Sequence, residues 1–138
     1  MGARAELTVK INAVLNLSHK KLDVYVISLK LVKEVYTTTK TFPKEEQFGL
    51  ISQLRRAAIS VCSNIAEGLA RRSKQEKKRF YEIARSSAVE IDTQLEAALL
   101  LEYRKNDQTN ELEQYLESVF RMLSKMIENL DNQPPTSH

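Results

Sequence analysis

The residues whose types and spacing could do chemistry gather in one basic segment. In residues 71–79, six of nine positions are Lys or Arg, and Glu76 is the single acid. Clustered Lys and Arg bind polyanions such as nucleic acids, because each phosphate that they neutralise releases counterions. A dense basic segment near a helix end also keeps a helical protein soluble. The segment alone therefore leaves a phosphate-binding surface and a solvated helix end as alternatives.

Few other residues could support catalysis. The two histidines, His19 and His138, lack the carboxylate partners at helical spacing that di-metal bundles use. Cys62 falls on an apolar helix face, where a buried structural thiol is expected rather than a nucleophile. No glycine-rich phosphate loop occurs. The sequence predicts a protein that is not an enzyme, with no catalytic residues, no metal site and no cofactor.

Composition and charge narrow the class of protein. The chain has 138 residues, three Gly and one Cys, and it is rich in helix-forming residue types. Residues 1–89 hold 17 basic and 8 acidic residues, whereas residues 90–138 hold 4 and 10. One Cys cannot form an internal disulfide, and no run approaches the roughly 20 apolar residues that span a bilayer. We expect a single-domain cytoplasmic protein with no membrane partner.

Four segments show the apolar period of an amphipathic helix. The expected helices span about residues 18–40, 43–69, 74–104 and 108–130. Pro43 suits a first helical turn, and Ser73 with Glu76 forms a capping box. Gly68 is expected to end the second helix in a left-handed conformation.

The short connections predict how these helices are arranged. Helices joined by few residues run antiparallel, which gives an all-α, up-down-up-down four-helix bundle over residues 19–131. Residues 1–18 are expected to form an N-terminal extension, and residues 132–138 a C-terminal tail.

The first helix is apolar on two sides. One stripe contains Leu22, Tyr25, Leu29, Val32 and Tyr36, and the other contains Val24, Ile27, Leu31 and Val35. A helix with two apolar faces must be covered twice, once by its own bundle and once by something else. We therefore expect self-association, and we place Val24, Ile27, Leu31 and Val35 at the subunit interface.

A polar row follows one face of the second helix. Its members recur at spacings of three and four residues and are Gln53, Arg56, Ser60, Asn64 and Glu67, with Arg71 continuing the row. Small, amide and oppositely charged residues on one face suit a ligand groove or a subunit contact. We favour the subunit contact.

An antiparallel arrangement would place the start of the first helix beside residues 71–79, so that one end of the bundle is strongly basic. The candidate nucleic-acid-binding residues are Lys20, Lys21, Arg71, Arg72, Lys74, Lys77, Lys78, Arg79 and Arg85. Tyr81 is the aromatic residue beside this cluster that could stack on a base.

Three segments resemble a known family. They are FPKEEQFGL (residues 42–50), QLRRAAISVCSNIAEG (residues 53–68) and RFYEIARSSAVEI (residues 79–91). They resemble the bacterial four-helix-bundle proteins encoded by intervening sequences of 23S rRNA genes, to which the accessory variability factor of diversity-generating retroelements is related. The resemblance covers roughly residues 20–130. It implies a homopentamer with a basic surface that binds nucleic acid and, in the retroelement branch, a reverse transcriptase.

The resemblance also marks particular positions. The shared motif contains Arg55, Arg56, Asn64, Glu67 and Gly68, and Arg71 and Arg72 fall in its basic continuation. Arg85 replaces a usual Gly and extends the basic stripe, while Cys62 stands where the family often has Pro or a small residue. We predict an oligomeric nucleic-acid-binding bundle that prefers RNA. The alternative is a protein-interaction scaffold, or an accessory factor for a partner such as a reverse transcriptase.

Overall fold

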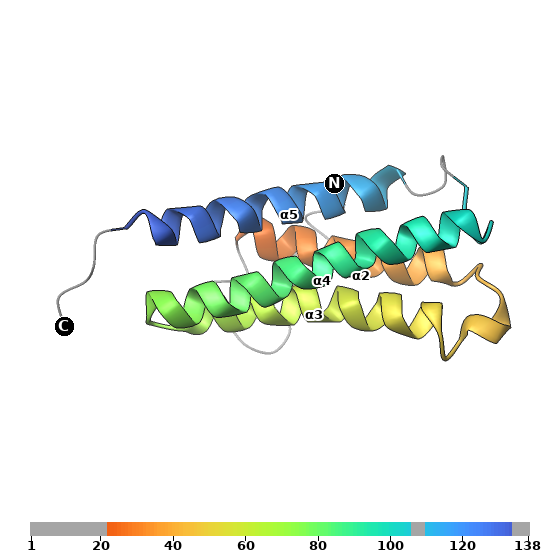
Figure 1. The fold of residues 1–138 in the computed structure, drawn as a ribbon, viewed down its shortest axis with the longest axis horizontal. Coiled ribbons are helices and arrows are strands. Elements are labelled where there is room, and N and C mark those ends of the chain that lie inside the picture. Colours follow the sequence, from red (N-terminus) through yellow and green to blue (C-terminus); the bar gives the residue numbers. More distant parts are fainter. Residues whose placement is uncertain (1–21, 106–109, 134–138) are drawn as a thin grey trace, which may run out of the picture.

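The computed structural model describes residues 22–105 and 110–133, and Figure 1 shows them as a bundle of long helices. Within these ranges the chain forms four α-helices and no strand: α2 (Asp23–Thr39), α3 (Leu50–Ala70), α4 (Lys74–Leu100) and α5 (Asn110–Asp131), with a short 3-10 helix, η2 (Lys44–Glu46), before α3. The predicted all-α, four-helix fold is confirmed. The expected extension, residues 1–18, lies outside the described residues, as does most of the expected tail.

Helix α3 begins seven residues later than Pro43, because residues 43–49 form η2 and a turn. The Glu46 carboxylate caps the helix by accepting a hydrogen bond from the Leu50 backbone N–H at 3.0 Å. A side-chain oxygen in this position satisfies one of the N–H groups that a helix start leaves without a partner. The predicted start at Pro43 is wrong. Glu46, three residues after Pro43, supplies the actual cap.

Helix α4 begins where the capping box predicted. The Ser73 hydroxyl accepts a hydrogen bond from the Glu76 backbone N–H at 3.1 Å. The helix ends at Leu100, four residues before the expected end. Glu102 adopts a positive φ of 62°, and the Tyr103 N–H donates to the Ala98 carbonyl at 2.9 Å. These features form a Schellman-type stop.

Gly68 does not have the predicted left-handed conformation, because none of the described glycines has a positive φ. It lies inside α3 and is buried, and a Cβ there would stand 2.5 Å from Cε1 of Tyr81. The glycine is therefore needed for the close approach of α3 and α4, which the sequence of one helix does not reveal. Helix α3 ends two residues later, where Arg71 takes an extended conformation with ψ 154°.

The core runs along the bundle, and each helix packs against two others. Helix α3 packs against α2 and α4, and α5 packs against the same two helices. Fully buried large side chains come from all four helices and include Leu31, Leu54, Ile65, Ile91, Leu112 and Leu123. Small residues of α3 and α4 also belong to this core, since Ala58, Ala84 and Ala88 are buried in it.

The stripe of α2 that we placed at the subunit interface belongs to this core. Val24, Leu31 and Val35 are buried within the bundle, and Ile27 is half-buried against it. The prediction that these residues face a second copy is wrong for the three buried ones. Periodicity identifies two apolar stripes but does not say which one faces inward, and α2 must contact both α3 and α5. On the other stripe Leu22 and Tyr36 remain 46% and 37% exposed.

Candidate nucleic-acid interface

The basic turn, which we define as residues 71–79, joins α3 to α4. Arg71 ends α3, Arg72 and Ser73 make the connection, and the remaining residues form the first turns of α4. Arg71, Arg72 and Arg79 are exposed, whereas the three lysines of the turn are half-buried. The basic residues therefore divide by type into an exposed arginine set and a partly covered lysine set. Lys20 and Lys21, which we expected beside them, lie outside the described residues.

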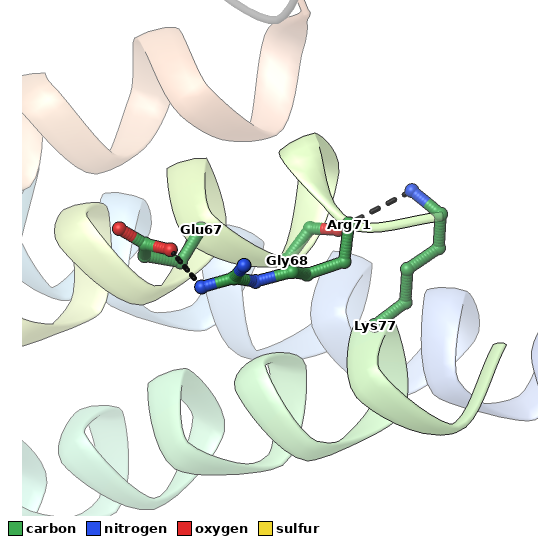
Figure 2. A network of polar contacts seen from close by, with 4 residues as sticks. All are labelled: Glu67, Gly68, Arg71 and Lys77. Carbon is green, nitrogen blue, oxygen red and sulfur yellow. Dashed lines mark hydrogen bonds and ion pairs between the residues drawn. The ribbon is translucent and has the colours of Figure 1, made fainter. Parts of the chain in front are cut away.

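Two of the exposed arginines lie against one aromatic ring. The guanidinium carbon of Arg71 lies 4.9 Å from the centroid of the Phe80 ring, and that of Arg79 lies 5.3 Å from it. Arg71 also forms an ion pair with Glu67 at 2.8 Å, which Figure 2 shows. Arg72 makes no hydrogen bond or ion pair with another described residue. The ring holds two guanidinium groups near one another, and both arginines remain exposed.

The aromatic residue of this cluster is Phe80 and not Tyr81, which we expected. Tyr81 is only 4% exposed and lies in the core, where it packs on Gly68. Phe80 is half-buried between the two arginines. Adjacent residues on a helix point in directions about 100° apart, so a one-residue error exchanges a surface residue for a core residue.

Lys77 closes the end of α3. Its ammonium group donates to the backbone carbonyls of Gly68 at 3.2 Å and Leu69 at 3.3 Å. Figure 2 shows the Lys77 side chain reaching across the turn to the Gly68 carbonyl. The last carbonyls of a helix lack intrahelical partners and carry partial negative charge, so a cation there is favourable. Lys77 therefore has a structural role that its place in a basic run does not indicate.

The other two lysines connect the start of α4 to the end of α5. Lys78 pairs with the Asp131 carboxylate at 2.8 Å, and Lys74 donates to the backbone carbonyl of Gln133 at 2.9 Å. The hydrogen bond to Asp131 raises the pKa of Lys78 above its ordinary value. Exposed contacts of this kind contribute little to stability, so a polyanion could displace them.

Arg85 stands apart from the basic turn. It is half-buried, and its guanidinium donates to the Ser124 hydroxyl on α5 at 3.3 Å. We expected Arg85 to extend the basic stripe, but this contact directs it toward α5. The family-motif residue Arg55 is likewise engaged, since it donates to Thr39 Oγ1 at 2.9 Å and covers the Tyr36 ring.

The polar row of α3 borders a groove between α3 and α4. This polar groove has a volume of about 380 Å³ and is lined by Gln53, Arg56, Ala57, Ser60, Ser87, Glu90 and Gln94. Asn64 donates its amide to the Ser60 carbonyl at 2.8 Å, and Glu67 pairs with Arg71, so both are engaged within α3. The α4 residues were missed because only the row on α3 was considered. Residues 87, 90 and 94 are polar and recur at spacings of three and four, which indicates a second polar row on one face of α4.

Other kinds of site are not found among the described residues. In these ranges no group of three His, Cys, Asp or Glu side chains could hold a metal ion. Cys62 is buried, and this burial raises the pKa of its thiol. None of the described helices combines the length and apolar character needed to cross a membrane.

The fold and the site define a class: a four-helix bundle with an arginine-rich turn between its second and third described helices. Within that class, the chain belongs to the 23S rRNA-intervening sequence protein family, whose model matches residues 20–125. This finding confirms the resemblance in the motif segments. It does not concern the retroelement proteins.

A solved structure has a similar fold. It is a protein of unknown function from the S23 ribosomal protein family of Bacteroides thetaiotaomicron VPI-5482, with a TM-score of 0.70 and 23% sequence identity. The similarity covers 76% of this chain and 95% of that chain. At this identity the likeness supports the fold alone. A comparison with curated proteins found no match.

Proposed function

We propose that this protein is a non-enzymatic, oligomeric nucleic-acid-binding protein that prefers RNA and contacts phosphates through the basic turn. The observation that carries the proposal is the set of three exposed arginines at the basic turn, two of which, Arg71 and Arg79, lie against the Phe80 ring. Guanidinium groups present paired N–H donors that match phosphate oxygens, and their charge does not depend on pH in the physiological range. Arg71, Arg72 and Arg79 are the principal contacts in this proposal.

The lysines have a secondary part in the proposal. Lys74, Lys77 and Lys78 already bind carbonyls or a carboxylate, so each must exchange a partner before it contacts a phosphate. They add to the local positive potential without that exchange, because potential does not require direct contact. Arg85, which already donates to Ser124, is a secondary contact on the same reasoning, and Lys20 and Lys21, which lie outside the described residues, stay candidates from the sequence.

We further propose that the bundle is antiparallel, up-down-up-down, and that it self-associates, as a homopentamer if it follows the family resemblance. Several copies would multiply the basic turns and increase avidity for a long polyanion. Tyr36 and Ile59 are the best-supported contacts, because both are exposed and line one surface hollow with Arg55 and Arg56. They replace the buried Val24, Leu31 and Val35 in that role, and Ile27 remains a candidate at its edge.

The proposed function is tested by matched charge removal. One variant changes Arg71, Arg72 and Arg79 to Gln, and a control changes the exposed Lys33, Arg121 and Lys125 to Gln, so that both lose the same charge. We expect the first variant to lose most of its affinity for structured RNA in fluorescence anisotropy, with a shallower salt dependence. Equal losses in the two variants would show that net charge, and not the basic turn, controls binding.

Light scattering tests the self-association separately. Tyr36→Ser with Ile59→Ser should reduce the assembly state of the protein, because it removes apolar surface that a second copy would cover. A wild-type protein that is monomeric at micromolar concentration would contradict the assembly but not the RNA binding.

A protein-interaction role is the second candidate function, and the opposite end of the bundle favours it. Phe48 and Leu100 are 92% and 84% exposed there, and Leu101, which follows Leu100 in the chain, is 52% exposed. Leu100 and Leu101 are consecutive exposed apolar residues at this end, and exposed apolar surface of this kind is a common site of protein contact. A scaffold, or an accessory factor for a partner such as a reverse transcriptase, would use this end. Weak RNA binding that does not change with salt would favour this function over the first.

A further inference from the structure

The polar groove contains hydrogen-bonding groups that the protein itself does not satisfy. Gln94 Oε1 is buried at the groove and has no hydrogen-bond partner among the described residues. A buried carbonyl oxygen without a donor is uncommon and unfavourable in folded proteins. The groove is therefore lined by a side chain whose hydrogen bonding the rest of the bundle leaves incomplete.

The groove also contains a serine hydroxyl hydrogen that has no acceptor among the described residues. Ser60 Oγ and Ser87 Oγ lie 2.8 Å apart, and either can be the donor. Asn64 Nδ2 lies 3.1 Å from Ser60 Oγ and can only donate to it. Two hydroxyl hydrogens share one Ser60–Ser87 bond, so one of them remains for another acceptor.

The two walls of the groove carry opposite charges. Arg56 comes from α3 and Glu90 from α4, and both are exposed. Neither forms an ion pair with another described residue. The groove thus offers a planar fork of donors on one wall and a pair of carboxylate acceptors on the other.

We propose that the polar groove binds a guanine base from unpaired RNA. Guanine presents the acceptors O6 and N7, which Arg recognises with two hydrogen bonds. Its Watson–Crick edge presents the donors N1–H and N2–H, which a carboxylate accepts as a pair. Arg56 therefore binds O6 and N7, and Glu90 binds N1–H and N2–H. Adenine, cytosine and uracil do not present two adjacent N–H donors of this kind.

The position of the groove agrees with the proposed function, on which this inference rests. Arg56 lies on α3 and Arg71 directly follows the last residue of that helix, fifteen positions and roughly 22 Å farther along. A single strand held at the basic turn can extend along this helix. Glu67 and Glu90 along the path repel phosphates, which favours insertion of a base over contact with the backbone.

The experiment uses the full-length protein and short single-stranded RNAs with one central position varied. We expect guanine at that position to bind about tenfold or more tightly than adenine, the scale of one lost bidentate base contact. Inosine lacks the N2 amino group and tests Glu90, whereas 7-deazaguanine lacks N7 and tests Arg56. Each should bind more weakly than guanine.

Two variants assign the preference to the groove. Arg56→Gln and Glu90→Gln should each abolish the preference for guanine over adenine. Arg121→Gln, which removes an exposed arginine of α5, should retain it. Circular dichroism must show unchanged helix content, because only a folded variant reports on the groove.

The possible failures are distinguishable. Equal binding of guanine and adenine RNAs, with a normal salt dependence, would overturn this inference and leave the proposed function standing. No binding to any RNA would overturn both. A change of assembly state in Arg56→Gln, seen by light scattering, would assign the groove to a contact between copies and overturn the inference.

Discussion

The two ends of the bundle differ in how they close their helices. At the basic turn, charged side chains complete the connection: Lys77 binds the last carbonyls of α3, and Lys78 pairs with Asp131. At the other end, which we call the apolar end, residues 42–49 pack against the turn after α4. The Phe42 and Tyr103 rings lie 5.6 Å apart, and the Tyr103 hydroxyl donates to Glu46 at 2.9 Å. Figure 1 shows the two ends at opposite extremes of the long axis.

The comparison distinguishes charged residues that stabilise the fold from charged residues that stay exposed to a ligand. At the apolar end one carboxylate, Glu46, caps α3 and anchors Tyr103, so it serves the fold alone. At the basic turn the lysines serve the fold, and the arginines stay exposed. A count of basic residues would treat all six as equivalent. Their contacts indicate that Arg72 and Arg79 form no ion pair with another described residue, whereas Arg71 pairs with Glu67 in an exposed contact.

The largest expected effect comes from the glycine at each end. A Cβ at Gly68 would meet the buried Tyr81 ring at 2.5 Å, whereas a Cβ at Gly49 would meet the Glu46 carboxylate at 2.6 Å. We expect Gly68→Ala to lower the free energy of unfolding by about 2 kcal/mol, because a packed ring cannot move without strain. Gly49→Ala should cost less, because the Glu46 side chain can rotate away. Urea denaturation of both variants checks the order, and equal losses would contradict it.

The apolar end should also accept a stabilising change. Glu102 holds a positive φ of 62°, a conformation that is unfavourable for residues with a Cβ. Glu102→Gly should raise the free energy of unfolding by about 1 kcal/mol. Glu102→Gln is the control, since it removes the charge and keeps the strain. Thermal denaturation that ranks the two variants equally would assign the effect to charge.

Arg72 and Lys77 provide a comparison within the basic turn. Arg72→Met should weaken RNA binding several-fold at low salt and reduce the salt slope by about 0.7, the effect of one lost phosphate contact on a single strand. Lys77→Met should weaken RNA binding less and lower stability by about 0.5 kcal/mol, since it leaves helix carbonyls without a cation. Anisotropy and urea denaturation should therefore give opposite rankings. Identical binding losses would mean that the lysine is as available as the arginine.

The smallest effect concerns acid stability at the apolar end. The hydrogen bond from the Leu50 N–H, with a second from Tyr103, lowers the pKa of Glu46 below its ordinary value. A lowered pKa in the folded state contributes stability above the unfolded pKa, and this contribution is lost as pH falls through the folded pKa. Wild type should therefore lose more stability between neutral pH and acid pH than Glu46→Gln does. Glu45→Gln, from the same turn, should follow the wild-type curve in denaturation at several pH values.

Local signals in the sequence were sufficient for some of this structure. The Ser73 cap was predicted because it depends on four consecutive residues, and the four helices were predicted because each has its own apolar period. Signals that depend on a second helix were not sufficient. Gly68 was assigned to a helix stop because its contact with Tyr81 is visible only when α3 and α4 are paired.

The candidate site was predicted only in outline. The basic turn is visible in the sequence, but the division between exposed arginines and engaged lysines depends on α5, which supplies Asp131 and precedes Gln133. The choice between Phe80 and Tyr81 required the rotation of α4 to be known to within one residue. For the same reason the inner stripe of α2 was assigned outward. The α4 side of the polar groove was missed, because the polar row had been traced along α3 alone.

The contact between Gly68 and Tyr81 also sets the distance between α3 and α4. Helices α3 and α4 are joined by a short turn. A bulky side chain near that turn would push the two helices apart along their length. The polar groove lies farther along the same two helices. The width of the polar groove therefore depends on the absence of a Cβ at residue 68. A larger side chain at that position would change the distance between Arg56 and Glu90.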